Sequence, residues 1–273
     1  MTLLPVINQQ LAILLAAKLA ALAILVSCAE YLVLPRPLQD SGLMSWAVGR
    51  LRSPLLVKGP TGRVLNWLLA YPRILGLIAL RAAIALLILF GPSAVVLNPL
   101  LLCLLVLLSM LLTIRNAFGT NGADQMGDIL FVGLAVVSIV TTHTTISVYL
   151  WFLTFQACLA YATAGIAKAV ASGWRDGTYL IGICGTRIYG NARLRDLLLA
   201  RPTLAKWLAR LVIIWECTFP LVLLLPLPLA LVVLVGGIVF HLMMGYIMGL
   251  NDFVWSFLAA YPAILYCLQM RGW

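Results

Sequence analysis

Long runs of apolar residues dominate the chain, and Pro, Gly or charged residues separate them. Taking these interruptions as boundaries predicts helices at about residues 6–34, 66–90, 94–114, 126–141, 146–171, 205–225, 229–248 and 252–270. A membrane-spanning helix needs roughly 20 apolar residues, which most of these runs provide. The pattern therefore predicts an all-α fold, a polytopic transmembrane helical bundle of about eight helices.

Composition excludes a water-soluble globule. Hydrophobic residues make up 64% of the chain and charged residues only 10%, whereas a soluble domain carries roughly 25% charged residues. An outer-membrane barrel would alternate polar and apolar residues over segments of about ten positions, and runs such as 94–112 do not alternate. The run 6–34 is too long for the apolar part of a signal peptide, so we expect it to be retained as a helix. Residues 1–273 are expected to form a single transmembrane domain.

The net charge of +10 is concentrated in two long connections. Residues 35–65 hold five basic residues against one acidic residue, and residues 173–204 hold five against two. With eight spans both connections lie on one side, which the positive-inside rule makes cytoplasmic. Basic residues here suit anionic lipid headgroups. The sequence shows no basic surface interleaved with aromatic residues, so we expect no nucleic-acid partner.

Metal binding is not expected from the cysteine pattern. The six cysteines are widely separated, and the sequence contains no C-x-x-C pair and no mixed Cys/His cluster. We therefore predict no metal cofactor and interpret the cysteines as small apolar residues.

Ionisable side chains at membrane depth are functional candidates, because the hydrocarbon offers them no water. Several have structural explanations: Lys18 and Arg81 can extend to the surface or pair with a carboxylate, and His143 sits in a short polar segment near the interface. Asp124 and Asp128 are near a helix start, where carboxylates suit the positive end of the helix dipole. The complete set is Lys18, Glu30, Arg81, Asp124, Asp128, His143, Lys168, Glu216 and His241.

Lys168 is the sharpest candidate. It comes near the end of a predicted helix, before the break at 172–174, and small residues such as Gly165 surround it in sequence. Small residues permit close helix contacts that would bury the ammonium group, and desolvation disfavours the charged form, so such a lysine can act as a neutral amine base. The alternative is that Lys168 extends to the headgroups.

Glu216 and His241 lie in two other predicted helices. They could complete a polar pocket around Lys168, or they could bond each other as a structural pair, and the sequence leaves both open. An ionised Glu216 beside Lys168 would favour the ammonium form. A base role for Lys168 therefore requires Glu216 to be protonated or turned toward another partner such as His241.

These segments resemble the HTTM family, the membrane domain shared with vitamin K-dependent gamma-carboxylase. The specific part is Tyr161-x-x-Ala164-Gly165-x-x-Lys168, followed by Trp174-Arg175-Asp176-Gly177. Weaker pieces occur in the family's order along the chain: Asn121-Gly122-Ala123-Asp124, Glu216 with Pro220, and Phe240-His241 with Gly245. At the first of these the carboxylase has Asn-His, so this chain lacks that histidine. The length is similar to short bacterial members, including the sporulation-delaying protein B family.

The resemblance implies an enzyme, a carboxylase-like lyase or ligase of the bacterial inner membrane. Lys168 matches the base that deprotonates a reduced isoprenoid quinone such as vitamin K hydroquinone or menaquinol; O2 then converts the quinol to an alkoxide base, and CO2 adds to a glutamate. Glu216, His241, Asp124, Trp174, Gly165 and Tyr161 would shape the site. The implied partners are a secreted peptide precursor and a companion protein.

Two other classes of function remain open at this point. One is a non-catalytic membrane subunit or immunity-type factor that binds a peptide or quinone without chemistry. The other is a proton-coupled transporter in which the intramembrane charges form a relay. A catalytic role depends on the amine of Lys168 itself, whereas a structural partner should tolerate an apolar residue of similar length there.

Overall fold

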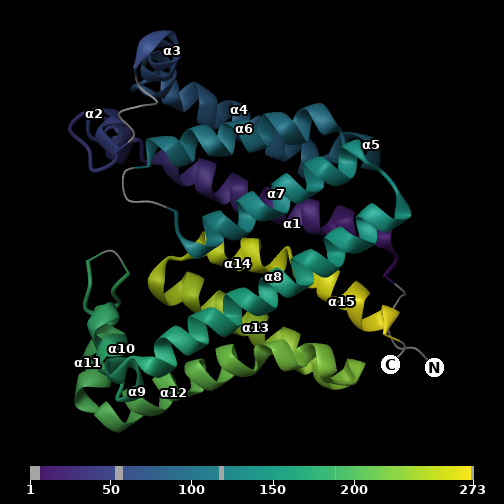
Figure 1. Cartoon of the computed structure of the whole chain (residues 1–273). Coiled ribbons are helices and arrows are strands. Elements are labelled where there is room, and N and C mark those ends of the chain that lie inside the picture. The colour runs from purple at the N-terminus through teal and green to yellow at the C-terminus, as the bar shows by residue number, and fades with distance from the viewer. Residues whose placement is uncertain (1–6, 53–57, 117–119, 188, 272–273) are drawn as a thin grey trace. The chain divides into compact units, whose positions relative to one another are not determined.

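The computed structural model describes residues 7–52, 58–116, 120–187 and 189–271. Helices account for most of these residues, and the described ranges contain no strand (Figure 1). The chain divides into two compact units, residues 13–149 and residues 1–12 with 150–273. We describe each unit by itself. The all-α class expected from the apolar runs is confirmed.

Seven described helices are long and apolar enough to cross a membrane: α1 (Gln9–Val33), α4 (Arg73–Phe90), α7 (Gly122–Ile139), α8 (His143–Val170), α12 continued by η3 (Pro202–Leu224), α13 (Leu227–Met248) and α14 with α15 (Asn251–Met270). The apolar helix α6 (Pro99–Arg115) has 17 residues, at the lower limit for a span. Each of the eight predicted runs is therefore helical, and their lengths suit a multi-pass membrane protein.

The two long basic connections contain helices that the apolar pattern did not predict. Between α1 and α4 lie η1 (Arg36–Leu38), α2 (Trp46–Gly49), η2 (Arg50–Arg52) and α3 (Gly59–Leu69). Between α8 and α12 lie α9 (Ser172–Arg175), α10 (Thr178–Cys184) and α11 (Ala192–Ala200), and α5 (Ser93–Val96) precedes α6. The predicted helices 66–90 and 94–114 already overlap α3 and α5. The others were not predicted, because they are short and their polar residues do not produce a long apolar run.

Proline and helix caps explain where the observed ends differ from the predicted ones. The predicted helix 66–90 is divided, because Pro72 between α3 and α4 has no N–H to donate. Pro220 and Pro262 are the second residues of η3 and α15, where a missing N–H is likewise tolerated. Helix α7 starts at Gly122 rather than 126 because Asn121 and Asp124 form a reciprocal capping box.

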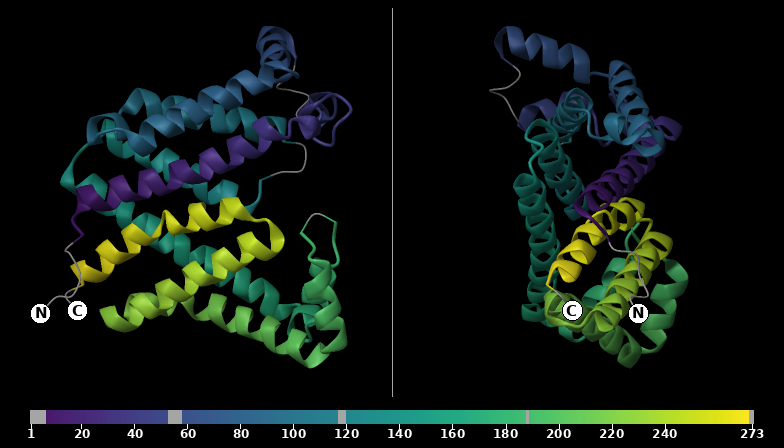
Figure 2. Two further views of the ribbon diagram at one scale, coloured as in Figure 1. Left: turned by 180° about the vertical axis from the view of Figure 1, so that it is seen from behind. Right: turned by 90° about the vertical axis from the view of Figure 1, so that its right-hand side faces the viewer.

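In the unit of residues 13–149, α6 packs between α4 and α7 (Figure 2). Aliphatic side chains fill this contact, including Ile78, Ile88, Leu102, Leu105, Leu130 and Leu134, all essentially buried. Two cationic side chains of this unit, Lys18 and Arg115, donate hydrogen bonds to backbone carbonyls. The Lys18 Nζ donates to the carbonyls of Leu89 (2.7 Å) and Gly91 (3.2 Å) at the end of α4.

Arg115, at the end of α6, is only 2% exposed. Its Nε donates to the Leu69 carbonyl (3.0 Å) and one Nη donates to the Leu38 carbonyl (2.7 Å). One guanidinium therefore ties the connection before α3, the end of α3 and the end of α6 together.

In the other unit, α13 packs along α14 and also contacts η3 and α15. The short helices form a separate small core of Cys184, Leu198 and Ala205, on which Leu180, Ile181, Leu194 and Leu204 pack. This core joins α10, α11 and α12. The start of α12 is thus held by α10 and α11, while Glu216 lies near the other end of α12.

Replacing Arg115 by Met should lower thermal stability in detergent. The change removes two hydrogen bonds from a charged donor, each contributing about 1.5–3 kcal/mol, and leaves two carbonyls without that donor. Circular dichroism during heating measures the effect. Arg193→Met, at an exposed position, is the matched control and should leave the melting temperature unchanged; an equal effect of both substitutions would contradict the role given to Arg115.

Single cysteines at Lys58 and Arg193, in a background without the native cysteines, test how often the chain crosses the membrane. If α6 crosses, the two basic connections lie on one side, and a membrane-impermeant maleimide labels both positions from the same face. Labelling from opposite faces would mean that the predicted count of spans is wrong by an odd number, and α6, the shortest of these helices, would be the first candidate not to cross.

Candidate functional site

Lys168 and Glu216 form an ion pair between α8 and α12. The Lys168 Nζ lies 2.8 Å from Glu216 Oε1 and 2.6 Å from Oε2. The carboxylate side chain is 6% exposed and the lysine side chain 20%. A second ion pair joins the neighbours Arg195 and Asp196, and both of those side chains are far more exposed. Of these two pairs, Lys168–Glu216 lies between apolar helices.

A glycine lets the two helices approach closely enough for this pair. A Cβ atom built on Gly165 would lie 2.6 Å from the Cys217 backbone N and 2.9 Å from the Glu216 carbonyl carbon. Gly165 precedes Lys168 by three residues, so both lie on one face of α8. The close contact predicted from the small residues before Lys168 is therefore confirmed at Gly165.

The ring of Trp174 also lies close to the lysine. After α8 ends at Val170, the short helix α9 brings the indole ring to 5.4 Å from the Lys168 Nζ. Gly173 of α9 lies against the ring of Tyr179, which would have to shift to admit a Cβ atom there. The Lys168 Nζ therefore has the Glu216 carboxylate and the Trp174 indole ring as neighbours, and an ammonium group can interact favourably with an indole face.

This geometry decides a point that the sequence left open. Glu216 directs both oxygens to Lys168 and does not pair with His241. Of the two conditions under which Lys168 could act as a base, turning Glu216 toward another partner is therefore not met in this structure. The remaining condition is a proton on Glu216.

His241 belongs to a separate hydrogen-bonded cluster. The Tyr161 Oη lies 2.6 Å from His241 Nε2 and 3.1 Å from the Tyr261 Oη, and all three side chains are buried. The Tyr161 ring stacks on Phe219 with centroids 3.8 Å apart, and His241 stacks on Phe257 at 4.7 Å. Gly237 leaves the space that the Tyr261 hydroxyl occupies.

The cluster and the ion pair share one helix. Tyr161 precedes Lys168 by seven residues, two turns of α8, and so lies on the same face, close enough to Glu216 for an electrostatic interaction. Tyr261 and Phe219 were not among the sequence candidates. The available signal for Tyr261 was its hydroxyl, which needs a partner when it is buried in an apolar helix.

Asp124 has a local role in the structure. Its backbone N–H donates to the Asn121 Oδ1 (2.8 Å), and its own Oδ2 accepts from the Asn121 backbone N–H (3.1 Å). It caps α7 in the unit of residues 13–149. The other six site residues, Tyr161, Gly165, Lys168, Trp174, Glu216 and His241, all belong to the unit that contains residues 150–273. In the described ranges, no group of three or more His, Cys, Asp or Glu side chains gathers to hold a metal ion.

Gly165→Ala should destabilise the protein, because the new methyl group would meet the backbone of α12. Overpacking of this kind costs typically 1–3 kcal/mol. Gly76→Ala in α4 is the matched control: no atom lies within 4 Å of its Cβ position, and the change is expected to stabilise the helix by roughly 0.5–1 kcal/mol. Melting temperatures in detergent compare the two, and a Gly165→Ala protein as stable as the Gly76→Ala protein would contradict the close approach.

No protein-family model matches the chain, and neither does any curated protein or any solved structure. The resemblance to the HTTM family accordingly rests on the motif residues of the sequence and stays a prediction.

Proposed function

We propose that this chain is a multi-pass enzyme of the bacterial inner membrane that performs acid–base chemistry on a reduced isoprenoid quinone, with Lys168 as the base. The observation that carries the proposal is the Lys168 Nζ held between the Glu216 carboxylate and the Trp174 ring in an apolar helix pair. An amine, a carboxyl group and an aromatic face are suited to a hydroquinone, which offers a weakly acidic hydroxyl on an aromatic ring.

Glu216 supplies the proton acceptor that a lysine base needs. Two opposite charges are costly to keep in a medium of low dielectric constant. Transfer of one proton from the Lys168 ammonium to Glu216, across a contact of 2.6 Å, leaves a neutral amine and a neutral carboxylic acid. This exchange meets the condition that Glu216 carries a proton when Lys168 acts.

The amine can then accept a proton from a bound hydroxyl group. The substrate O–H bond breaks, a new N–H bond forms at Nζ, and the electron pair stays on the substrate oxygen. The quinol, when bound, supplies reducing chemistry toward O2, as the family resemblance implies. A peptide precursor and CO2 as further substrates, and a companion protein as partner, belong to the same proposal and rest on the resemblance.

A second candidate function follows from the fact that Lys168 and Glu216 bond to each other. Lys168 and Glu216 satisfy each other, as expected of a tie between helices in a non-catalytic subunit or immunity-type factor. A pair that exchanges a proton also suits a proton-coupled transporter. Neither candidate requires Lys168 to act as a base. The tolerance of an apolar residue at position 168, expected from the sequence for a structural partner, does not fit this geometry, because such a residue would leave the Glu216 carboxylate without its partner.

The experiment compares oxidation of a hydroquinone with and without the purified protein. Hydroquinones react with O2 faster once deprotonated, so a protein that removes the proton should speed quinone formation, followed by absorbance. Native mass spectrometry with excess menaquinol measures binding separately. In Lys168→Arg, we expect binding to persist and the acceleration to fall by about 100-fold or more, the usual contribution of a general base, because guanidinium does not deprotonate.

Lys18→Arg is the matched control, since Lys18 is also in an apolar helix but donates to backbone carbonyls. It should keep the full acceleration. Equal acceleration by Lys168→Arg and the wild type would overturn the catalytic role and leave the non-catalytic candidate. Absence of any bound menaquinol would overturn the choice of a quinol as substrate.

A further inference from the structure

A second intramembrane polar site lies in the unit of residues 13–149, independent of Lys168. Arg81 of α4 extends its guanidinium toward α6 and α1: its Nε donates to the Ser109 Oγ (3.2 Å), and one Nη lies 4.0 Å from the Cys28 Sγ. Asp128 of α7 interacts electrostatically with Arg81. Polar side chains from four apolar helices thus gather in one place.

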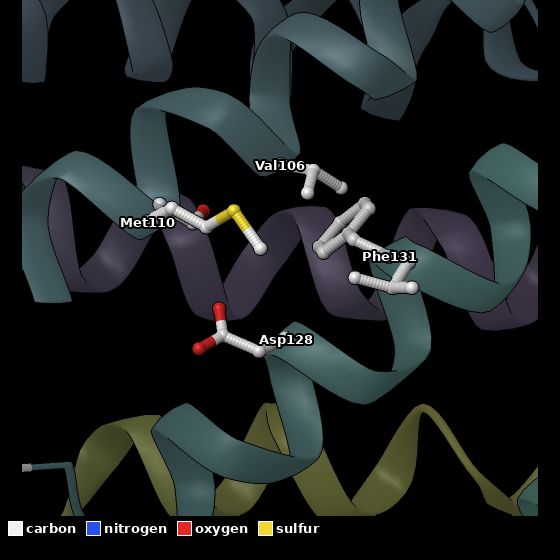
Figure 3. Close-up of a pocket in the computed structure, with 6 residues that line it drawn as sticks. Val106, Met110, Asp128 and Phe131 are labelled. Carbon is white, nitrogen blue, oxygen red and sulfur yellow. The ribbon is translucent and has the colours of Figure 1, made fainter.

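Asp128 faces a small cavity rather than a hydrogen-bond donor. The cavity measures about 40 Å³, and Figure 3 shows Asp128 across from Val106, Met110 and Phe131. Ser109 and Val132 complete its lining. Within the described residues, no side chain or backbone group makes a direct hydrogen bond or ion pair with the Asp128 carboxylate. It is also not a helix cap, although a position near a helix start had suggested one.

The size and chemistry of the cavity indicate what it holds. A water molecule needs roughly 10–15 Å³ measured in this way, and polar partners to bond. Asp128 and Ser109 provide those partners. A metal ion is a poor match, because one carboxylate and one hydroxyl are few ligands and the nearby Arg81 charge repels a cation.

We propose that Asp128 is a proton-binding carboxylate of the membrane domain, and that water in this cavity links it to Ser109 and Arg81. On protonation, an O–H bond forms at the Asp128 carboxyl as a hydronium ion releases its proton and becomes water. The charged groups that act on this carboxyl are Arg81 from α4 and Asp124 on α7 itself, and Cys28 of α1 contacts Arg81. Tyr149 of α8 is engaged elsewhere, since its hydroxyl donates to the Leu130 carbonyl.

The exposed walls of the cavity allow a direct chemical test. Met110 and Val132 are 53% and 42% exposed, so a lipid-soluble reagent can reach Asp128 through them. Dicyclohexylcarbodiimide adds to protonated carboxylic acids: the acid proton moves to a carbodiimide nitrogen, the carboxyl oxygen bonds to the central carbon, and rearrangement leaves a stable N-acylurea. The full-length protein in detergent or liposomes is treated between pH 5 and 8 and mapped by peptide mass spectrometry.

We expect Asp128 to gain one reagent molecule, with a yield that falls as pH rises. Asp128→Asn should abolish this adduct, and Arg81→Gln should extend labelling to higher pH, because the cation that stabilises the carboxylate is gone. If the wild-type protein gains no adduct at Asp128 at any pH, although its melting temperature shows that it is folded under these conditions, the proposal is overturned. An identical pH profile in Arg81→Gln would overturn the assignment of Arg81 to the site. The outcome is independent of the Lys168 experiment, since the two sites share no residue.

Discussion

The constraint on which this structure depends is that a polar group inside apolar helices must find its partner in the protein, because hydrocarbon offers none. The described cations meet it in different ways. Lys18 donates to two carbonyls at the end of α4, and Arg115 donates to carbonyls of two segments that precede α4. Lys168 meets the constraint with a carboxylate. Each of these interactions joins segments that are distant in sequence. The polar side chains therefore help to fix how the helices pack.

The Lys168–Glu216 pair differs from the other two because both partners can change protonation. The backbone carbonyls bonded to Lys18 and Arg115 cannot take up a proton, whereas the Glu216 carboxylate can. In the proposed function, a proton passes between the two partners of this pair. Removing one partner alone would leave an unpaired charge, which costs much more than the pair itself contributes. The same ion pair therefore joins α8 to α12 and consists of two groups that can each gain or lose a proton.

The aromatic cluster fixes the helix that carries Lys168. Tyr161 has hydrogen-bond partners on α13 and α15 and a stacked ring on η3, so three elements determine the rotation of α8 about its axis. That rotation also directs Gly165 and Lys168 toward α12. The small and aromatic residues thus position the ion pair without taking part in it.

The sequence by itself determined the all-α class and the eight apolar helices, because run length depends only on neighbours in the chain. It also marked the ionisable residues at membrane depth, of which Lys168 and Glu216 do come together. The motif residues Gly165 and Trp174 lie beside that pair. Local rules account for the helix ends once proline and capping are considered, as at Pro72 and the capping box of Asp124. The tertiary structure alone decided the pairings. It placed His241 with Tyr161 rather than Glu216, and Asp128 beside a cavity near Arg81. These choices depend on how each helix is rotated and how closely it packs, and both are set by contacts between residues far apart in sequence.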